Sequence, residues 1–249
     1  MIDIGNISVS YRENTVLKDF SAKFEMGRLT SILGRNGSGK STLLKNILSL
    51  VPLKAGTITI DGQDIGSMKQ NDIAKKVAYL PQGRAIPNMT VSQLVLHGRF
   101  PHISYPKRYS ETDRSIALAS IEQMSLKEHA DDLICTLSGG MRQRAYIAMA
   151  LAQRTEHILL DEPTAYLDVS YQLETMRILQ ELANSGKSII CVTHDIPLAL
   201  SFSDTVLVID NGSAVFCGPP EEALDKGIID SVFGVSVIKN TNSFSIELK

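Results

Sequence analysis

The chain has 249 residues, of which 43% are hydrophobic, so it can bury a sizeable core as one large domain or as one domain with an inserted lobe. Its formal net charge of -2 argues against an overall electrostatic attraction to nucleic acid or to anionic lipid. Its three cysteines are scattered and form no CxxC pair, which argues against a disulfide framework or a zinc site and favours a reducing compartment.

The N-terminal third is predicted to be rich in strands. Residues 2–11, IDIGNISVSY, alternate apolar and polar side chains, and they lack the charged start and apolar core of a signal peptide. Further strands are expected at 20–27, 29–34, 55–65 and 77–82, with a helix at 41–50 that Pro52 closes.

Residues from about 83 to 132 change character. They are polar and mostly helical by pattern, with loop signals at 86–90 and 100–108, which indicates an inserted helical lobe. Strands that alternate with helices then resume and favour an α/β fold with a mainly parallel sheet. These strands are predicted at 157–163, 188–195, 206–212 and 213–218, and a helix at 171–186.

No apolar run approaches the about 20 residues that a membrane helix needs. A protein of this composition that works at a membrane would therefore act there through a partner.

The clearest motif is a phosphate-binding loop. Residues 34–41, GRNGSGKS, fit G-x-x-x-x-G-K-[ST] and lie between an apolar strand and a helix. Glycines there let the backbone approach phosphate oxygens, so that N–H groups and the helix N-terminus face the anion. Lys40 would neutralise the β- and γ-phosphates, Ser41 would bind Mg²⁺, and Thr42 would add a hydroxyl. The other members of this loop are Gly34, Arg35, Asn36, Gly37, Ser38 and Gly39.

Polar residues follow other predicted strands at the end where open α/β sheets bind ligands. Asp161 and Glu162 follow a buried strand, as a magnesium carboxylate and a water-orienting carboxylate would in a phosphate-loop protein. Gln82 and His194 also follow apolar strands, although each alone could be a turn residue or a partly buried histidine. Tyr11 is either a half-buried strand residue or a side chain that stacks on a base.

A further segment, LSGGMRQR at 137–144, precedes a helix-forming run. A serine and glycines before a helix can bind an anion, because the first turn leaves N–H groups unpaired. The alternative is an ordinary N-cap, in which the Ser138 side chain accepts a backbone N–H.

Taken in order, these motifs strongly resemble the nucleotide-binding subunit of ATP-binding cassette (ABC) transporters, over essentially the whole chain. The resemblance implies an α/β fold: a P-loop NTPase (RecA-like) core with a mainly parallel sheet, N-terminal antiparallel strands and an inserted helical subdomain. It places the core at residues 1–84 and 156–249 and the helical subdomain, with the LSGGM signature segment, at 85–155. ATP and Mg²⁺ are the implied cofactors.

The resemblance also implies roles for single residues. Tyr11 would stack on adenine with Val16 nearby, while Ser41, Gln82 and Asp161 would hold Mg²⁺. The catalytic residues would be Glu162 as general base, His194, Gln82 and Lys40. In a head-to-tail homodimer, the signature residues would meet the γ-phosphate bound to the partner, and Asp168 would belong to a loop at the interface. The signature residues are Ser138, Gly139 and Gly140.

One residue departs from the family pattern. Met141 stands where the family usually has glutamine or glutamate. The lost polar group would weaken a contact to the ribose of the opposite nucleotide, and we expect a modest loss rather than inactivity.

The segment 97–113, HGRFPHISYPKRYSETD, followed by a helix and by LSGGMRQRAYIAMALAQ at 137–153, resembles the importer branch for iron–siderophore complexes, haem and cobalamin, and LDVSYQLE at 167–174 fits too. Members of that branch are homodimers at the cytoplasmic face of the cell membrane, bound to two permease subunits that an extracytoplasmic binding protein supplies. An iron–siderophore or related iron chelate is the expected solute, with cobalamin and haem as alternatives. Soluble ABC ATPases that act on DNA or ribosomes form a different class, and a module that does not hydrolyse ATP a third.

Overall fold

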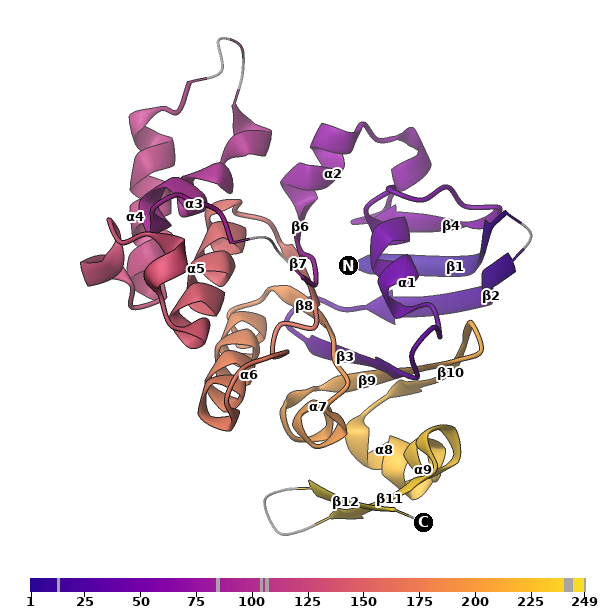
Figure 1. Ribbon diagram of the computed structural model, residues 1–249. Helices are drawn as coiled ribbons and strands as arrows, with labels where there is room; N and C mark the ends of the chain where they lie inside the picture. The colour runs from indigo at the N-terminus through magenta and orange to yellow at the C-terminus, as the bar shows by residue number, and fades with distance from the viewer. Residues whose placement is uncertain (13, 84–85, 104, 106–107, 240–243, 249) are drawn as a thin grey trace.

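The computed structural model describes the chain except residues 13, 84–85, 104, 106–107, 240–243 and 249. In Figure 1 a central sheet separates a helical lobe from a second sheet that contains the N-terminus. No helix in the described part of the chain has the length and apolar character needed to cross a membrane.

The central sheet has six strands among the described residues, in the order β10-β9-β3-β8-β7-β6. The pairs from β9 to β6 are parallel, and only β10 runs antiparallel to its neighbour. Strands β3, β7 and β8 are buried along their whole length, as expected of parallel strands covered on both faces. The strands are β3 (Leu29–Gly34), β6 (Val77–Leu80), β7 (His157–Asp161), β8 (Ser188–Val192), β9 (Thr205–Asp210) and β10 (Ser213–Gly218).

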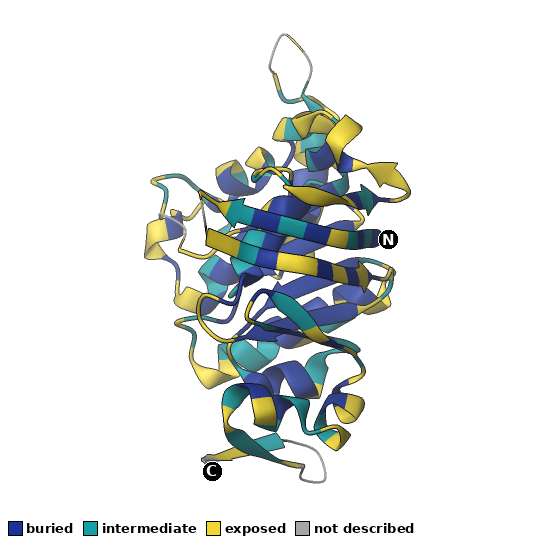
Figure 2. Ribbon diagram, turned by 90° about the vertical axis from the view of Figure 1, so that its right-hand side faces the viewer, coloured by how far each residue is buried: buried dark blue, intermediate teal, exposed yellow. Residues whose placement is uncertain are grey.

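The second sheet is antiparallel, in the order β2-β1-β4-β5. Buried and more exposed residues alternate along β1, which Figure 2 shows as a change of colour from residue to residue. Helix α1 (Lys40–Ile47) packs between the two sheets, because its Leu43, Leu44 and Ile47 share a buried cluster with strands of both. The strands are β1 (Ile2–Tyr11), β2 (Asn14–Phe24), β4 (Ala55–Ile60) and β5 (Gln63–Asp64).

The helical lobe consists mainly of α3 (Val91–His97), α4 (Glu111–Gln123) and α5 (Gly139–Ala152), which pack on one another. Their apolar faces share one buried cluster with β7, β8 and α6 (Val169–Asn184), so the lobe has a common core with the central sheet. Helix α2 (Gln70–Lys76) lies just before β6. The 3-10 turns are η1 (Ile65–Ser67), η2 (Phe100–His102), η3 (Lys127–His129) and η4 (Ile134–Thr136).

The last part of the chain packs beside β9 and β10, and its apolar residues share a buried cluster with these two strands. The sequence analysis predicted none of the elements in this part. One of them, α7 (Ile196–Phe202), precedes β9. The others follow β10 and are α8 (Pro220–Asp225), α9 (Ile228–Phe233), β11 (Val235–Lys239) and β12 (Phe244–Leu248).

The predicted fold class is confirmed: a mainly parallel sheet, an antiparallel N-terminal sheet and an inserted helical lobe are all present. Part of the loop predicted at 100–108 forms the η2 turn, while residues 104 and 106–107 of that loop lie outside the described residues. Residues 84 and 85, at the expected boundary between core and helical subdomain, also lie outside them.

Candidate active site

The phosphate loop connects β3 to α1 and depends on glycine at defined points. Gly37 and Gly39 have φ angles of 80° and 106°, a region that side chains with a β-carbon rarely adopt. A β-carbon at Gly39 would also lie 2.6 Å from Leu17 of β2. At Gly34 it would lie 2.5 Å from the carbonyl oxygen of Ile209. The loop therefore packs closely between β2 and β9.

Lys40 is folded into this loop. Its Nζ donates hydrogen bonds to the carbonyl oxygens of Gly34, at 2.7 Å, and Arg35, at 3.0 Å. Burial lowers the pKa of Lys40, and the nearby carboxylates of Glu162 and Asp161 oppose that change. The ammonium group thus already stands where phosphate oxygens would meet it.

Asp161 ends β7 as a buried carboxylate, with 4% of its surface exposed. Burial raises the pKa of Asp161, although the Ser41 hydroxyl donates a hydrogen bond to it. Its Oδ1 is buried and has no hydrogen-bond partner among the described residues. An unpaired buried carboxylate oxygen beside a hydroxyl is a good fit for Mg²⁺, which typically takes one or two carboxylates together with substrate phosphates.

Tyr79 of β6 also contacts this carboxylate, and the sequence reasoning missed it. Burial and the neighbouring Asp161 carboxylate raise the pKa of Tyr79 to about 12, and its phenol hydrogen-bonds to Asp161. The sequence carries no signal for this contact, because β6 and β7 are neighbours only in the folded sheet and an aromatic residue in a strand usually belongs to the core.

Glu162 lies next to Asp161 in a strained backbone conformation, with φ at 53°. Its N–H donates to the carbonyl of Val192 at the end of β8. Gln82 Nε2 donates to Glu162 Oε2 at 2.7 Å, and His194 Nε2 lies 2.8 Å from Oε1. Gln82 and His194, predicted at separate strand ends, therefore each contact one oxygen of the Glu162 carboxylate.

Lys40, Glu162, Gln82 and His194 face one cavity of about 380 Å³, of which Asp161 and Tyr79 are not lining residues. It joins the phosphate loop to Gln82, Glu162 and His194, so the structure brings together most of the residues predicted from separate motifs. Tyr11 lies apart, at the exposed end of β1. The lining residues are Val16, Asn36, Gly37, Gly39, Lys40, Ser41, Thr42, Gln82, Glu162 and His194.

The signature segment does not line this cavity. Ser138 is the N-cap of α5, and its Oγ accepts the N–H of Met141 at 3.3 Å. Ser138 and Gly139 are exposed, whereas Gly140 is buried. Asp168 is the N-cap of α6, which packs beside α5. Gly139 instead lines a neighbouring cavity that also reaches Gln82 and Glu162, so within one chain the signature lies beside the phosphate-loop cavity without lining it.

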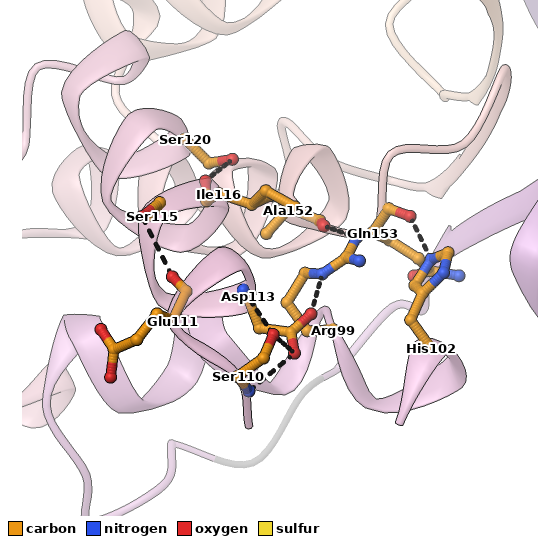
Figure 3. A network of polar contacts seen from close by, with 10 residues as sticks. All are labelled: Arg99, His102, Ser110, Glu111, Asp113, Ser115, Ile116, Ser120, Ala152 and Gln153. Carbon is orange, nitrogen blue, oxygen red and sulfur yellow. Dashed lines mark hydrogen bonds and ion pairs between the residues drawn. The ribbon is translucent and has the colours of Figure 1, made fainter. Parts of the chain in front are cut away.

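Arg99, His102, Ser110 and Asp113 of the segment 97–113 take part in the polar network of Figure 3, in which Arg99 is buried. Arg99 donates to Asp113 Oδ1 and to the carbonyl of Ala152, each at 2.9 Å. His102 Nε2 lies 2.9 Å from the carbonyl of Gln153. This network fastens the connection between α3 and α4 to the C-terminal end of α5, which carries the signature at its other end.

Residues 17–165 match the sequence profile of the ABC transporter family. The chain is 38% identical to the petrobactin import ATP-binding protein FpuD of Bacillus anthracis over 234 residues, 93% of this chain and 86% of FpuD. It is also 38% identical to the iron(3+)-hydroxamate import ATP-binding protein FhuC of Bacillus subtilis (strain 168) over 231 residues, 92% and 86% of the two chains.

Among solved structures, the fold is similar to a dimeric post-hydrolysis state of the ATP-binding cassette MJ0796 bound to ADP and Pi. The TM-score is 0.75 at 29% identity, over 88% of this chain and 99% of that chain.

Proposed function

Because this chain belongs to the ABC transporter family as an ATP-hydrolysing subunit, we propose that it energises the import of an iron–siderophore or related iron chelate. Two observations support the solute. The relatives named for petrobactin and iron(3+)-hydroxamate import align over more than nine-tenths of the chain. The segment 97–113, whose motif resembles that importer branch, is built into the lobe that carries the signature.

The observation that carries the hydrolytic role is the placement of Glu162. Its carboxylate lies at the edge of the phosphate-loop cavity, oriented by Gln82 and His194. It acts as the general base that takes a proton from the attacking water, and His194 steadies that water and the γ-phosphate.

Nucleotide binding is assigned to the residues that line the cavity, together with Tyr11 and Asp161 outside its lining. The phosphate loop and Thr42 donate N–H groups and hydroxyls to the phosphates, and Lys40 neutralises their charge. Tyr11 stacks on the adenine, with Val16 packed nearby. Ser41, Gln82 and Asp161 would hold Mg²⁺, which would supply charge neutralisation at the phosphates.

The signature acts on a second copy of the chain. Ser138, Gly139 and Gly140 start α5 and do not line the phosphate-loop cavity of their own chain, and the exposed Ser138 and Gly139 are accessible to the ATP of a partner. Two chains related by a two-fold axis then form two identical composite sites, with Asp168 in the loop at their interface.

The dimer works as a peripheral subunit on the cytoplasmic face of the membrane. It drives two permease subunits, which an extracytoplasmic solute-binding protein supplies. Within each chain, residues 1–84 and 156–249 form the catalytic core and 85–155 the helical subdomain of a single ABC ATPase domain.

Uptake in cells tests the solute. We expect deletion of the protein to abolish uptake of radiolabelled iron from at least one chelate, with unrelated solutes unaffected. Wild-type protein restores uptake, and Glu162→Gln, expressed at the same level, does not. Intact uptake of every iron chelate with loss of cobalamin or haem uptake would move the assignment to those solutes. The absence of any transport defect would favour a soluble ATPase acting on DNA or ribosomes.

A further inference from the structure

The start of the signature helix packs against α6 of the same chain through its two glycines. A β-carbon placed on Gly140 would lie within 2.6 Å of three ring carbons of Tyr171, closer than side-chain packing allows. A β-carbon on Gly139 would lie 3.3 Å from Cδ2 of Leu167, a contact that a flexible side chain can relieve. The aromatic ring therefore occupies the space that a side chain at 140 would need.

The contact continues along the two helices. One turn after Gly140, Arg144 Nη1 of α5 lies 3.5 Å from Glu174 Oε1 of α6. Tyr171 is half-buried in the first turn of α6, where its carbonyl accepts a 2.7 Å hydrogen bond from Thr175. The Tyr171 ring thus projects from α6 onto the backbone of α5 at Gly140.

The same segment of the core carries the proposed base. Glu162 and Tyr166 both have positive φ angles, 53° and 63°, and the N–H of Ala165 donates to the carbonyl of Glu162. This tight connection leads directly to Leu167 and into α6. The position of the signature start is therefore tied to the loop that carries Glu162.

We propose that Tyr171 is a positioning residue for the signature segment, and that residue 140 must be glycine because the Tyr171 ring takes the place of its side chain. The ring fixes where α5 begins, and so where Ser138 and Gly139 face a partner chain. The effect on the partner rests on the dimer proposed above, whereas the contact itself lies within one chain.

A double-mutant cycle on the melting temperature tests the contact without any dimer, in nucleotide-free protein. On helix propensity alone, Gly140→Ala should be neutral or stabilising. With Tyr171 present we expect Gly140→Ala to lower the melting temperature by several degrees. In the Tyr171→Ala background the same change should be neutral or raise it. Tyr171→Phe keeps the ring and should behave as the wild type. Gly139→Ala is the matched control, because only Leu167 would have to adjust.

A second readout follows the signature. In the Glu162→Gln background, where closed dimers should accumulate with MgATP, Gly140→Ala should weaken dimerisation at least tenfold and leave monomer ATP affinity within about twofold. Adding Tyr171→Ala should restore part of the dimerisation.

The outcomes separate the two proposals. If Gly140→Ala has the same effect on melting with and without the ring, the inference is overturned. It is also overturned if Tyr171→Ala restores melting but not dimerisation, because Gly140 would then be required by the partner nucleotide. If Glu162→Gln alone forms no dimer with MgATP, the proposed dimer fails, and the melting cycle still decides whether Tyr171 imposes the glycine.

Discussion

The side-chain amide of Gln82 donates a 2.7 Å hydrogen bond to the carboxylate of Glu162, although the two residues are 80 positions apart in the chain. The bond forms because Gln82 follows β6 and Glu162 follows β7, and these strands are parallel neighbours. Their carboxyl ends meet at one edge of the sheet. Gln82 lies just before the helical lobe and contacts the proposed base, Glu162, directly. A movement of that lobe would therefore be transmitted to Glu162 through this hydrogen bond.

Removal of either donor to Glu162 should impair hydrolysis more than binding. We expect Gln82→Ala and His194→Ala each to lower the turnover of MgATP by about 10²-fold, because an unoriented carboxylate aligns the water poorly. Affinity for ATP should change by only a few-fold, since the phosphate loop is untouched. Steady-state hydrolysis and equilibrium nucleotide binding measure the two effects. Equal losses in both would show that these residues act chiefly in binding.

Lys40→Ala should fail at the binding step. Its ammonium group is the positive charge held inside the phosphate loop, and its loss removes charge-assisted bonds to phosphate. We expect ATP affinity to fall by at least about tenfold, which corresponds to about 1.4 kcal/mol. Lys54→Ala, which removes an exposed lysine after α1, is the control and should bind ATP normally. Wild-type affinity in Lys40→Ala, measured by titration calorimetry, would contradict this role.

The buried pair in Figure 3 should be important for stability. The Ser110 hydroxyl, the Ser110 N–H and the Arg99 guanidinium hold the pKa of Asp113 to about 2. Arg99→Met removes the guanidinium from both the Asp113 carboxylate and the Ala152 carbonyl, while Ser110 still donates to Asp113, so we expect a loss of about 1.5–3 kcal/mol in urea unfolding. Arg114, which is 56% exposed and pairs only at 4.0 Å, provides the control. Arg114→Met should change stability by less than about 0.5 kcal/mol. Similar losses in both variants would refute the importance of the buried pair.

His157 should make stability depend on pH. It is fully buried at the start of β7, with Nε2 3.0 Å from Asp61 Oδ1, and burial lowers the pKa of His157 despite that carboxylate. In the native state His157 therefore stays neutral at a pH at which the same residue in the unfolded chain binds a proton, below about 6.5. Stability from this residue is present above that pH and is lost as the pH falls below it, by at most about 1.4 kcal/mol per unit.

Unfolding free energies at pH 7.5, 6.5 and 5.5 measure this effect against His157→Gln, which keeps a donor for Asp61 but does not titrate. The wild type should lose more free energy than the variant between pH 6.5 and 5.5. Parallel curves would show that His157 remains neutral, or becomes charged, equally in both states.

Sequence patterns predicted those parts of the candidate site that lie at strand ends. Asp161, Glu162 and His194 each follow a run of buried residues, and parallel order brings such ends together. The phosphate loop was readable because its glycine spacing is a local requirement of the backbone. The sequence also predicted the helical lobe, since its periodic pattern is local as well.

The contacts that the sequence did not predict depend on how helices and strands pack on one another. Tyr171 lies in a helix with an ordinary apolar pattern, and only the placement of α6 against α5 puts its ring over Gly140. Tyr79 meets Asp161 through strand order, which periodicity does not encode. The short elements α8, α9, β11 and β12 have too few residues for a reliable period.

Hydrolysis by the purified Glu162→Gln variant is the most direct measure of the central claim, that this subunit hydrolyses ATP with Glu162 as its base. The substitution keeps the size of the side chain but removes the group that accepts the proton. We expect MgATP to bind within a few-fold of the wild-type affinity, and turnover to fall by at least about a hundredfold, the contribution typical of a general base. Turnover within a few-fold of the wild type would contradict the assignment of Glu162.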